Sequence, residues 1–271
     1  MRVYTLGTSH GDSTDCRLNS STVYQTDNGT LYMVDAGAPC EALLRRQGLL
    51  LDRLKCTFVT HMHDDHAGGL SGLIKQAVKH DANRSWPLLV FLPEAKAISA
   101  LQNWIFALHE EADSPSVGYF AVEDGPVFED ENLRVYAVRT AHLRTRGRTE
   151  GDPCSFAYVL CFKKEKIKVL HSGDLRADFS DFPQLAAAEA FDLCVCEATH
   201  YDPYTAKATL KNAQFKRLIF NHIGNRWHNR TLEDGSFYNG ERALQDCFAD
   251  LPYPVEISHD GDVFELYCKT E

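Results

Sequence analysis

The segment His61-Met62-His63-Asp64-Asp65-His66 constrains this chain more than any other. It places three imidazoles and two carboxylates within six residues. The apolar run 56–60 before it predicts a buried strand, and residues 67–70 after it form a glycine turn. Histidine nitrogens suit zinc, iron or manganese, and carboxylates add harder oxygen ligands. A strand that ends in such a cluster predicts a metal site. A surface loop rich in histidine and aspartate is the alternative.

This pattern resembles the motif of the metallo-β-lactamase fold hydrolases. The resemblance extends to Thr60 before the cluster and to Gly68-Gly69 after it. It also includes the D-x-G element at Asp35, where the family carries an acid that supports the metal site. A plain turn aspartate is the alternative at that position.

Three more elements of the same family follow in the correct order, each just past a strand-like run. They are His142, the Ser-Gly-Asp element that ends in Asp174, and His222. For His142 taken alone, an ordinary loop residue is the alternative. The resemblance implies one metal on His61, His63 and His142, a second on Asp65, His66 and His222, and Asp174 as a bridge between them.

The chain is long enough, at 271 residues, for one large α/β domain. Strands dominate its first half and recur in the second with helices between them, and no linker, repeat or charge block divides it. This pattern fits two sheets packed face to face with helices outside. The resemblance implies a metallo-β-lactamase-like αββα four-layer sandwich, and we expect a single domain over residues 1–271.

A dinuclear centre of this kind implies a hydrolase. Two dications that share one water lower its pKa from about 15.7 to about 7, which supplies a bridging hydroxide at neutral pH. We expect two divalent metal ions, zinc first, with manganese or iron as alternatives. The catalytic residues that we expect beside the metals are Asp65, Glu197 and His200.

Glu197-Ala198-Thr199 resembles the ribonuclease Z branch, which cuts tRNA precursors at the 3′ end. That branch carries a long glycine- and proline-rich arm between its third histidine and its bridging aspartate. Here only 31 residues separate His142 from Asp174 (174 − 142 − 1). The histidine that those enzymes pair with the glutamate is also missing before position 222, and His200 is a candidate replacement. Both departures argue against tRNA maturation.

The loop after His142 holds Arg144, Arg146 and Arg148. Guanidinium groups match phosphate or carboxylate oxygens, so these arginines are candidate substrate-binding residues. A solvated hairpin tip is the alternative. The expected substrate is a small phosphodiester or cyclic phosphate. A lactone, thioester or other ester is the first alternative, and a tRNA 3′-end endonuclease or a non-catalytic metal-binding protein is less favoured.

The formal charge of 28 − 38 = −10 discourages stable nucleic-acid binding. We therefore expect a small anionic substrate as the partner, and we leave a homo-oligomer open. The nine cysteines lack a zinc-finger spacing, and we expect the close pair Cys194 and Cys196, in an apolar strand-like run, to be buried free thiols. Without a signal peptide or a membrane-length apolar run, we expect a cytoplasmic protein and no membrane partner.

Three local patterns make further predictions. Asp27-Asn28-Gly29 predicts a hairpin turn, because Asn-Gly tolerates positive φ. Residues 94–110 predict a helix, and residues 237–249 predict a last one. The apolar stripe of the first helix, with Trp104 nearby, predicts packed core: Ile98, Leu101, Ile105 and Leu108.

Overall fold

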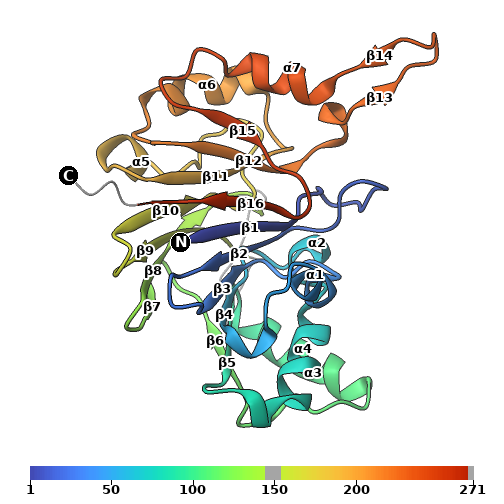
Figure 1. Cartoon of the computed structure of the whole chain (residues 1–271), viewed down its shortest axis with the longest axis vertical. Coiled ribbons are helices and arrows are strands. Elements are labelled where there is room, and N and C mark those ends of the chain that lie inside the picture. Colours follow the sequence, from blue (N-terminus) through green and yellow to red (C-terminus); the bar gives the residue numbers. More distant parts are fainter. Residues whose placement is uncertain (144–153, 268–271) are drawn as a thin grey trace.

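The computed structural model describes residues 1–143 and 154–267, and two seven-stranded sheets lie face to face within it (Figure 1). The first sheet is mixed, with antiparallel pairs at its β16 end and parallel pairs from β3 to β6. Its strand order is β16 (Asp262–Glu265), β1 (Arg2–Gly7), β2 (Ser21–Gln25), β3 (Leu31–Val34), β4 (Leu54–Phe58), β5 (Leu88–Leu92) and β6 (Val117–Ala121).

The second sheet pairs the remaining long strands. Its strands β10, β11, β12 and β15 run parallel, and β7, β8 and β9 add antiparallel pairs at the other end. The order is β15 (Val255–Ile257), β12 (Leu218–Ile223), β11 (Leu193–Ala198), β10 (Ile167–His171), β9 (Ser155–Phe162), β8 (Leu133–Thr140) and β7 (Gly125–Glu129).

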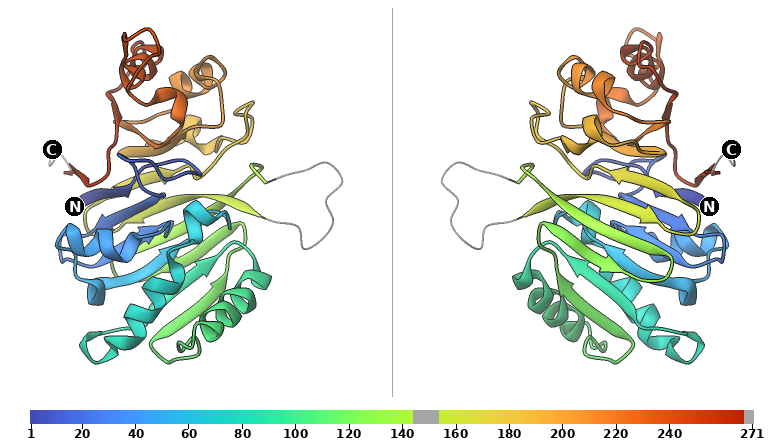
Figure 2. Two further views of the ribbon diagram at one scale, coloured as in Figure 1. Left: turned by 90° about the vertical axis from the view of Figure 1, so that its right-hand side faces the viewer. Right: turned by 90° about the vertical axis from the view of Figure 1, so that its left-hand side faces the viewer.

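Helices cover the outer face of each sheet (Figures 1 and 2). Three hydrophobic clusters correspond to the three interfaces between four layers, and the middle cluster lies between the sheets. This confirms the predicted αββα architecture. On the first sheet lie α1 (Cys40–Arg46), α3 (Leu70–Lys79) and α4 (Ala95–Ala107), and on the second lie α5 (Leu185–Ala188), α6 (Pro203–Asn212) and α7 (Gly240–Cys247).

Short elements complete the described chain. A one-turn helix, α2 (Asp64–Ala67), follows β4. The hairpin of β13 (Arg230–Thr231) and β14 (Phe237–Tyr238) extends away from the sheets (Figure 1). Three 3₁₀ turns are η1 (Leu51–Arg53), η2 (Asp81–Asn83) and η3 (Asn225–Trp227). Within residues 1–143 and 154–267, no helix has the length and apolar character needed to cross a membrane.

Aromatic rings fill the space between the two sheets. Phe58 of β4 is fully buried there. Its ring stacks on Phe91 at 4.8 Å and lies 5.7 Å from Tyr158 of the second sheet, measured between ring centroids. The hydroxyl of Tyr158 donates to the carbonyl of Val59 at 2.8 Å, so the polar end of this large side chain is also satisfied. These contacts hold the end of β4, and the metal-type residues after it, against the second sheet.

The hairpin prediction at residues 27–29 is confirmed, since β2 and β3 are antiparallel neighbours and Gly29 has φ 84°. The core prediction for the helix at 94–110 is wrong in part. Ile105 is buried, but Trp104 and Leu108 are 58% and 45% exposed. The helix ends at Ala107, so Leu108 is its non-helical C-cap residue and leaves the apolar stripe.

The last predicted helix starts later than residue 237. Phe237 and Tyr238 belong to the β13–β14 hairpin, and the helix begins at Gly240. Asn239 is its N-cap residue, and the Asn239 side chain accepts a hydrogen bond from the backbone N–H of Arg242 at 2.8 Å. An asparagine cap ends the hairpin and opens the helix, because it satisfies an N–H that has no partner in the first turn.

Replacing Phe58 with alanine should lower the free energy of unfolding by about 3–5 kcal/mol, because it removes a buried ring and leaves a cavity between the sheets. Chemical denaturation monitored by circular dichroism measures the change. Phe106→Ala is the matched control, since Phe106 is 78% exposed and should change stability by less than about 0.5 kcal/mol. Equal losses in the two variants would contradict this assignment of the core.

Candidate metal centre

The His61–His66 segment leaves the carboxyl end of β4 and turns at once into α2. His63 is the N-cap residue of that helix, and Asp65 and His66 lie within its single turn. The carbonyl of His66 accepts a hydrogen bond from the N–H of Ala36 at 2.7 Å, which ties α2 to the end of β3. An added Cβ on Gly37 would lie 2.2 Å from the carbonyl oxygen of Asp65, so only glycine permits this approach.

The second sheet supplies the other candidate ligands from neighbouring strand ends. His142 follows β8, Asp174 follows β10, and His222 lies near the end of β12. Gly173 turns the chain toward the site with φ 58°. A Cβ there would lie 2.8 Å from the carbonyl oxygen of Phe156, so both the backbone angle and the close packing require glycine.

The seven candidate ligands converge at the edge of the sheets. We call Asp65, His66 and His222 the buried trio, since none is more than 5% exposed. We call His61, His63 and His142 the open trio after its exposed member, His63; His61 is buried, and the side chain of His142 is 10% exposed. In each trio the candidate ligand atoms lie within 4.8 Å of one another, and Asp174 is within the same distance of the open trio.

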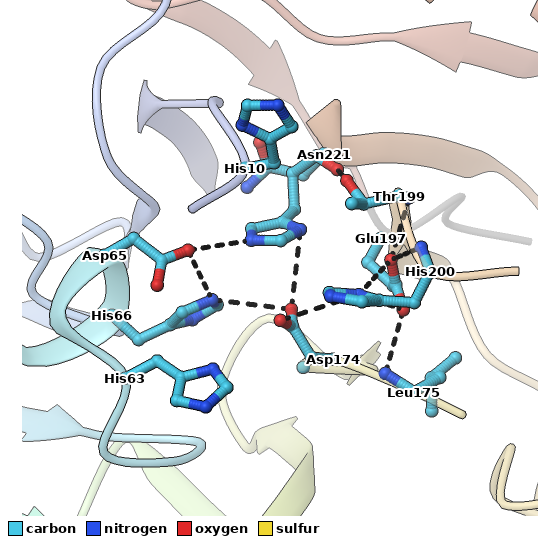
Figure 3. Close-up of polar contacts among 12 residues, drawn as sticks. His10, His63, Asp65, His66, Asp174, Leu175, Glu197, Thr199, His200 and Asn221 are labelled. Carbon is cyan, nitrogen blue, oxygen red and sulfur yellow. Dashed lines mark hydrogen bonds and ion pairs between the residues drawn. The ribbon is translucent and has the colours of Figure 1, made fainter. Parts of the chain in front are cut away.

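Asp174 lies between the trios with one carboxylate oxygen toward each. Figure 3 shows its contacts with His66 and His200. Its Oδ2 is 3.6 Å from His61 Nε2 and 3.7 Å from His142 Nε2. Its Oδ1 is 3.4 Å from His66 Nε2 and 3.5 Å from His222 Nδ1. This arrangement suits a carboxylate that bridges two cations.

The donor set fits divalent cations. Four polar atoms of the seven candidate ligands are buried and have no hydrogen-bond partner among the described residues: His66 Nε2, His142 Nε2, His222 Nδ1 and Asp174 Oδ1. Buried polar atoms are normally satisfied, and an unpaired group signals a ligand or a functional role. Imidazole and carboxylate together are ligands that zinc, iron and manganese share. The structure therefore supports metal binding at this cluster.

The charge states of two members of this cluster suit ligands. Burial opposes ionisation of Asp174, yet its interactions with His222, His66 and His61 lower the pKa of this carboxyl well below its ordinary value. Burial, followed by the charge of His66, lowers the pKa of His61, which keeps that imidazole neutral. A deprotonated carboxylate and a neutral imidazole are the forms that bind metal.

Asp35 supports the buried trio from the first sheet. It is fully buried at the end of β3, with φ 60°. Its Oδ2 is 2.7 Å from His66 Nδ1, and its Oδ1 accepts the N–H of Thr60 at 2.8 Å. A carboxylate on the second ring nitrogen orients a metal-binding histidine and makes it more basic. The turn aspartate seen in the sequence thus contacts a candidate ligand directly.

Glu197 plays a comparable part in the second sheet. Its Oε1 accepts the N–H of Leu175, the residue after Asp174, at 2.8 Å. Its Oε2 accepts the N–H of His200 at 2.9 Å and lies 3.0 Å from His200 Nδ1 (Figure 3). Burial disfavours the imidazolium of His200, but the Glu197 carboxylate raises the pKa of His200 to about 9.

His200 lies close to the candidate ligands. Its Nδ1 is 3.7 Å from Asp174 Oδ2, and its ring centroid is 4.6 Å from that of His142. It also forms a third possible ligand group with Asp174 and His222. The structure therefore places the predicted His200 beside the centre, where it can act as a proton donor or as a ligand.

One neighbour of His200 was not found from the sequence. Arg226, in η3 after His222, donates to the carbonyl oxygens of both Thr199 and Tyr201. The Thr199 hydroxyl in turn donates to the carbonyl of His222. These bonds tie the segment that carries His200 to the strand end that carries His222. An arginine in a polar loop offers no sequence signal for such a role.

The predicted substrate residues Arg144, Arg146 and Arg148 lie outside the described residues. The N-terminal loop approaches the site, since Ser9 forms a β-bridge with Ile223, the residue after His222; Figure 3 includes His10 from this loop.

The sequence matches the family model of the anti-Pycsar protein Apyc1 over residues 1–215, more than half of the chain. The chain belongs to the Apyc1 family. This Apyc1-family chain is also similar to curated ribonuclease Z proteins. It is 33% identical to that of Pseudomonas putida (strain GB-1) over 141 residues, 51% of the chain and 42% of that protein. It is 29% identical to that of Natronomonas pharaonis over 197 residues, 71% of the chain and 59% of that protein. It thus spans less than two thirds of either relative.

Solved structures show the same fold as the Apyc1-family chain. The metallo-β-lactamase fold protein YhfI from Bacillus subtilis superposes with a TM-score of 0.72 at 17% identity, over 97% of this chain and 98% of that one. The short form of human tRNase Z gives 0.70 at 20% identity, over 98% and 99%. A diphosphatase from the PhnP family gives 0.68 at 17% identity, over 98% and 97%. The chain is a metallo-β-lactamase fold protein near ribonuclease Z, as the sequence motifs predicted.

Replacing Asp174 with alanine should release bound metal, because it removes a carboxylate that faces both trios. Elemental analysis of the purified variant measures metal per chain. Asp178→Ala is the control, since the exposed carboxylate of Asp178 pairs with Arg176 and Ser180. Full metal content in Asp174→Ala would refute the bridging position.

Proposed function

We propose that this chain is a metal-dependent phosphodiesterase with two divalent cations, which hydrolyses a small phosphodiester or cyclic phosphate. The open trio holds one cation, the buried trio holds the other, and Asp174 bridges them. We further propose that residues 1–271 act as one catalytic domain, because both sheets supply ligands to the same centre.

The observation that carries this proposal is the position of Asp174 between the trios, with Oδ2 toward His61 and Oδ1 toward His66. Two cations held this way activate a water and neutralise charge on the attacking and leaving oxygens of a phosphodiester. The protein contributes by fixing the spacing of the trios. The close packing of Gly173 holds the backbone before Asp174, and the hydrogen bond from Leu175 to Glu197 holds the backbone after it.

His200 is the proposed proton donor to the leaving oxygen. Glu197 holds Nδ1 of the imidazole, which leaves Nε2 as the ring nitrogen that can donate to a substrate. Sugar and alkyl alkoxides are poor leaving groups and gain most from a positioned acid, whereas nitrophenolate leaves without one. This geometry supports the catalytic role that the sequence predicted for Glu197 and His200. We propose that Asp65 contributes to the reaction as a metal ligand in the buried trio.

The short segment between His142 and Asp174 favours a small substrate over a folded RNA. The hairpin of β9 and β10, residues 155–171, occupies 17 of the 31 residues between His142 and Asp174. The part of this interval that the structure does not describe is residues 144–153, and ten residues are too few for the long arm of ribonuclease Z. We propose that Arg144, Arg146 and Arg148 in this segment bind the anionic oxygens of the substrate.

The names of similar proteins agree with phosphate chemistry. The curated relatives are ribonucleases, and one solved structure is a diphosphatase. These names describe those proteins, and they support the phosphodiester over the lactone or thioester for this chain. The family name, anti-Pycsar protein, suggests the biological setting in which to seek the substrate.

A substrate panel tests the proposal directly. Protein loaded with zinc, manganese or iron should hydrolyse bis(p-nitrophenyl) phosphate and at least one cyclic nucleoside monophosphate, and acyl lactones much more slowly. Product formation is followed by absorbance and by chromatography. The Asp174→Ala variant is the control for contaminating enzymes. Turnover of lactones alone would replace the proposed reaction with ester hydrolysis.

Replacing His200 with alanine should affect substrates according to their leaving groups. We expect kcat for a cyclic phosphate, which expels an alkoxide, to fall by about 10²-fold or more. For bis(p-nitrophenyl) phosphate the fall should stay below about tenfold, because nitrophenolate needs no proton. Metal content measured on the same sample separates an acid from a ligand. Equal losses on both substrates, or loss of one cation, would show that His200 is no proton donor.

A further inference from the structure

We propose that the two cation positions are unequal: the buried trio holds a resident cation that binds first and tightly, and the open trio holds an exchangeable cation that binds second. This inference rests on the two-cation centre proposed above and concerns the order and strength of loading.

Burial is the first difference between the trios. Asp65, His66 and His222 are 5%, 1% and 3% exposed. Water therefore has little access to these three ligands, and a cation bound by them would be shielded. In the open trio His61 is fully buried, but His63 is exposed and the side chain of His142 retains 10% of its accessible surface. A cation leaves when water or a competing ligand displaces its donors, and His63 is the donor that solvent reaches most easily.

Charge is the second difference. The buried trio contains the carboxylate of Asp65, whose Oδ2 lies 3.0 Å from His222 Nε2 and 3.3 Å from His66 Nε2. The open trio consists of imidazoles only and depends on the shared Asp174 for its negative charge. A dication in the buried trio therefore meets two carboxylates, and one in the open trio meets one. Attraction between opposite charges is strong in a site with little water.

The partners behind the ligands strengthen the same asymmetry. The carboxylate of Asp35 lies 2.7 Å from His66 Nδ1 and so adds a third negative charge behind the buried trio. Behind the open trio the partners are neutral: the hydroxyl of Thr60 lies 3.1 Å from His61 Nδ1, and the carbonyl of Leu175 lies 3.2 Å from His142 Nδ1. A carboxylate in this position makes a histidine a better metal ligand than a neutral acceptor does.

The consequence is a centre whose second cation depends on supply. At limiting metal the chain should carry one cation, in the buried trio, and it should gain the second only when free metal rises. The exposed His63 provides the side from which this second cation enters and leaves. Hydrolysis that needs both cations would then follow the free concentration of the metal.

A metal titration tests the order of loading. The full chain is stripped of metal by dialysis against a chelator and is then titrated with Zn²⁺ in competition with a chromophoric chelator. We expect two binding steps of one equivalent each, separated by at least about tenfold in dissociation constant. A single class of two equal sites, or two steps closer than threefold, would overturn the inference.

Two matched variants assign the steps to the trios. His63→Ala should keep the first step within threefold of the wild-type value and lose the second. Asp65→Asn, which keeps the shape of the side chain, should weaken the first step by at least tenfold. The reverse pattern would assign the tight site to the open trio and would refute the proposal. Circular dichroism and thermal unfolding check that both variants are folded.

Asp35→Asn isolates the effect of charge behind the buried trio. Asparagine tolerates the positive φ of this position, so the backbone should be retained. We expect the first step to weaken by about 10–100-fold, the usual effect of losing such a partner, and the second to stay within threefold. Equal weakening of both steps, or of neither, would show that Asp35 does not create the difference.

The two proposals can fail separately. Total binding of fewer than two cations per chain would remove the dinuclear centre and with it this inference. Two unequal steps in a fully loaded chain that hydrolyses no phosphodiester would leave the inference standing and refute the proposed reaction.

Discussion

The carboxylate of Asp174 is the group on which the rest of the centre depends. It is 3% exposed and lies among imidazoles from four strand ends. A buried charge is costly unless opposite charges or hydrogen bonds surround it. The neighbouring histidines offset that cost, and bound cations would do so further. Gly173 before Asp174 and the hydrogen bond of Leu175 after it hold this carboxylate in its place between the sheets.

Two buried acids outside the ligand set brace the centre from opposite sides. Asp35 comes from the first sheet and holds His66 together with Thr60. Glu197 comes from the second sheet and holds the chain beyond Asp174 together with His200. Each sheet thus orients its own ligands through one carboxylate. The two carboxylates act on different parts of the centre, and the negative charge of Asp35 beside His66 contributes to the unequal loading that we propose.

Much of this could be predicted from the sequence, because the informative signals are local. A hydrophobic run that ends in a polar or glycine residue marks a strand end, and such ends precede His61, His142 and Asp174. Predictions failed where packing decides the outcome. The helical spacing around Trp104 suggested a buried stripe, but the helix ends at Ala107 and one face of it stays in solvent. Apolar periodicity shows that a face exists and does not show whether another element covers it.

The sequence by itself determined which residue types are present, their order and their position relative to strands, because these follow from neighbours in the chain. Their spacing does not group them: the family resemblance implied the two trios, and the tertiary structure brings the members of each trio together. His222 joins Asp65 across 157 positions, and Arg226 reaches back to the carbonyl of Tyr201. Sheet order and strand direction create these contacts, and no local spacing encodes them. The same is true of burial: His63 and His66 are three residues apart, yet His63 is exposed and His66 is buried, because His66 lies between Asp35 of the first sheet and Asp174 of the second.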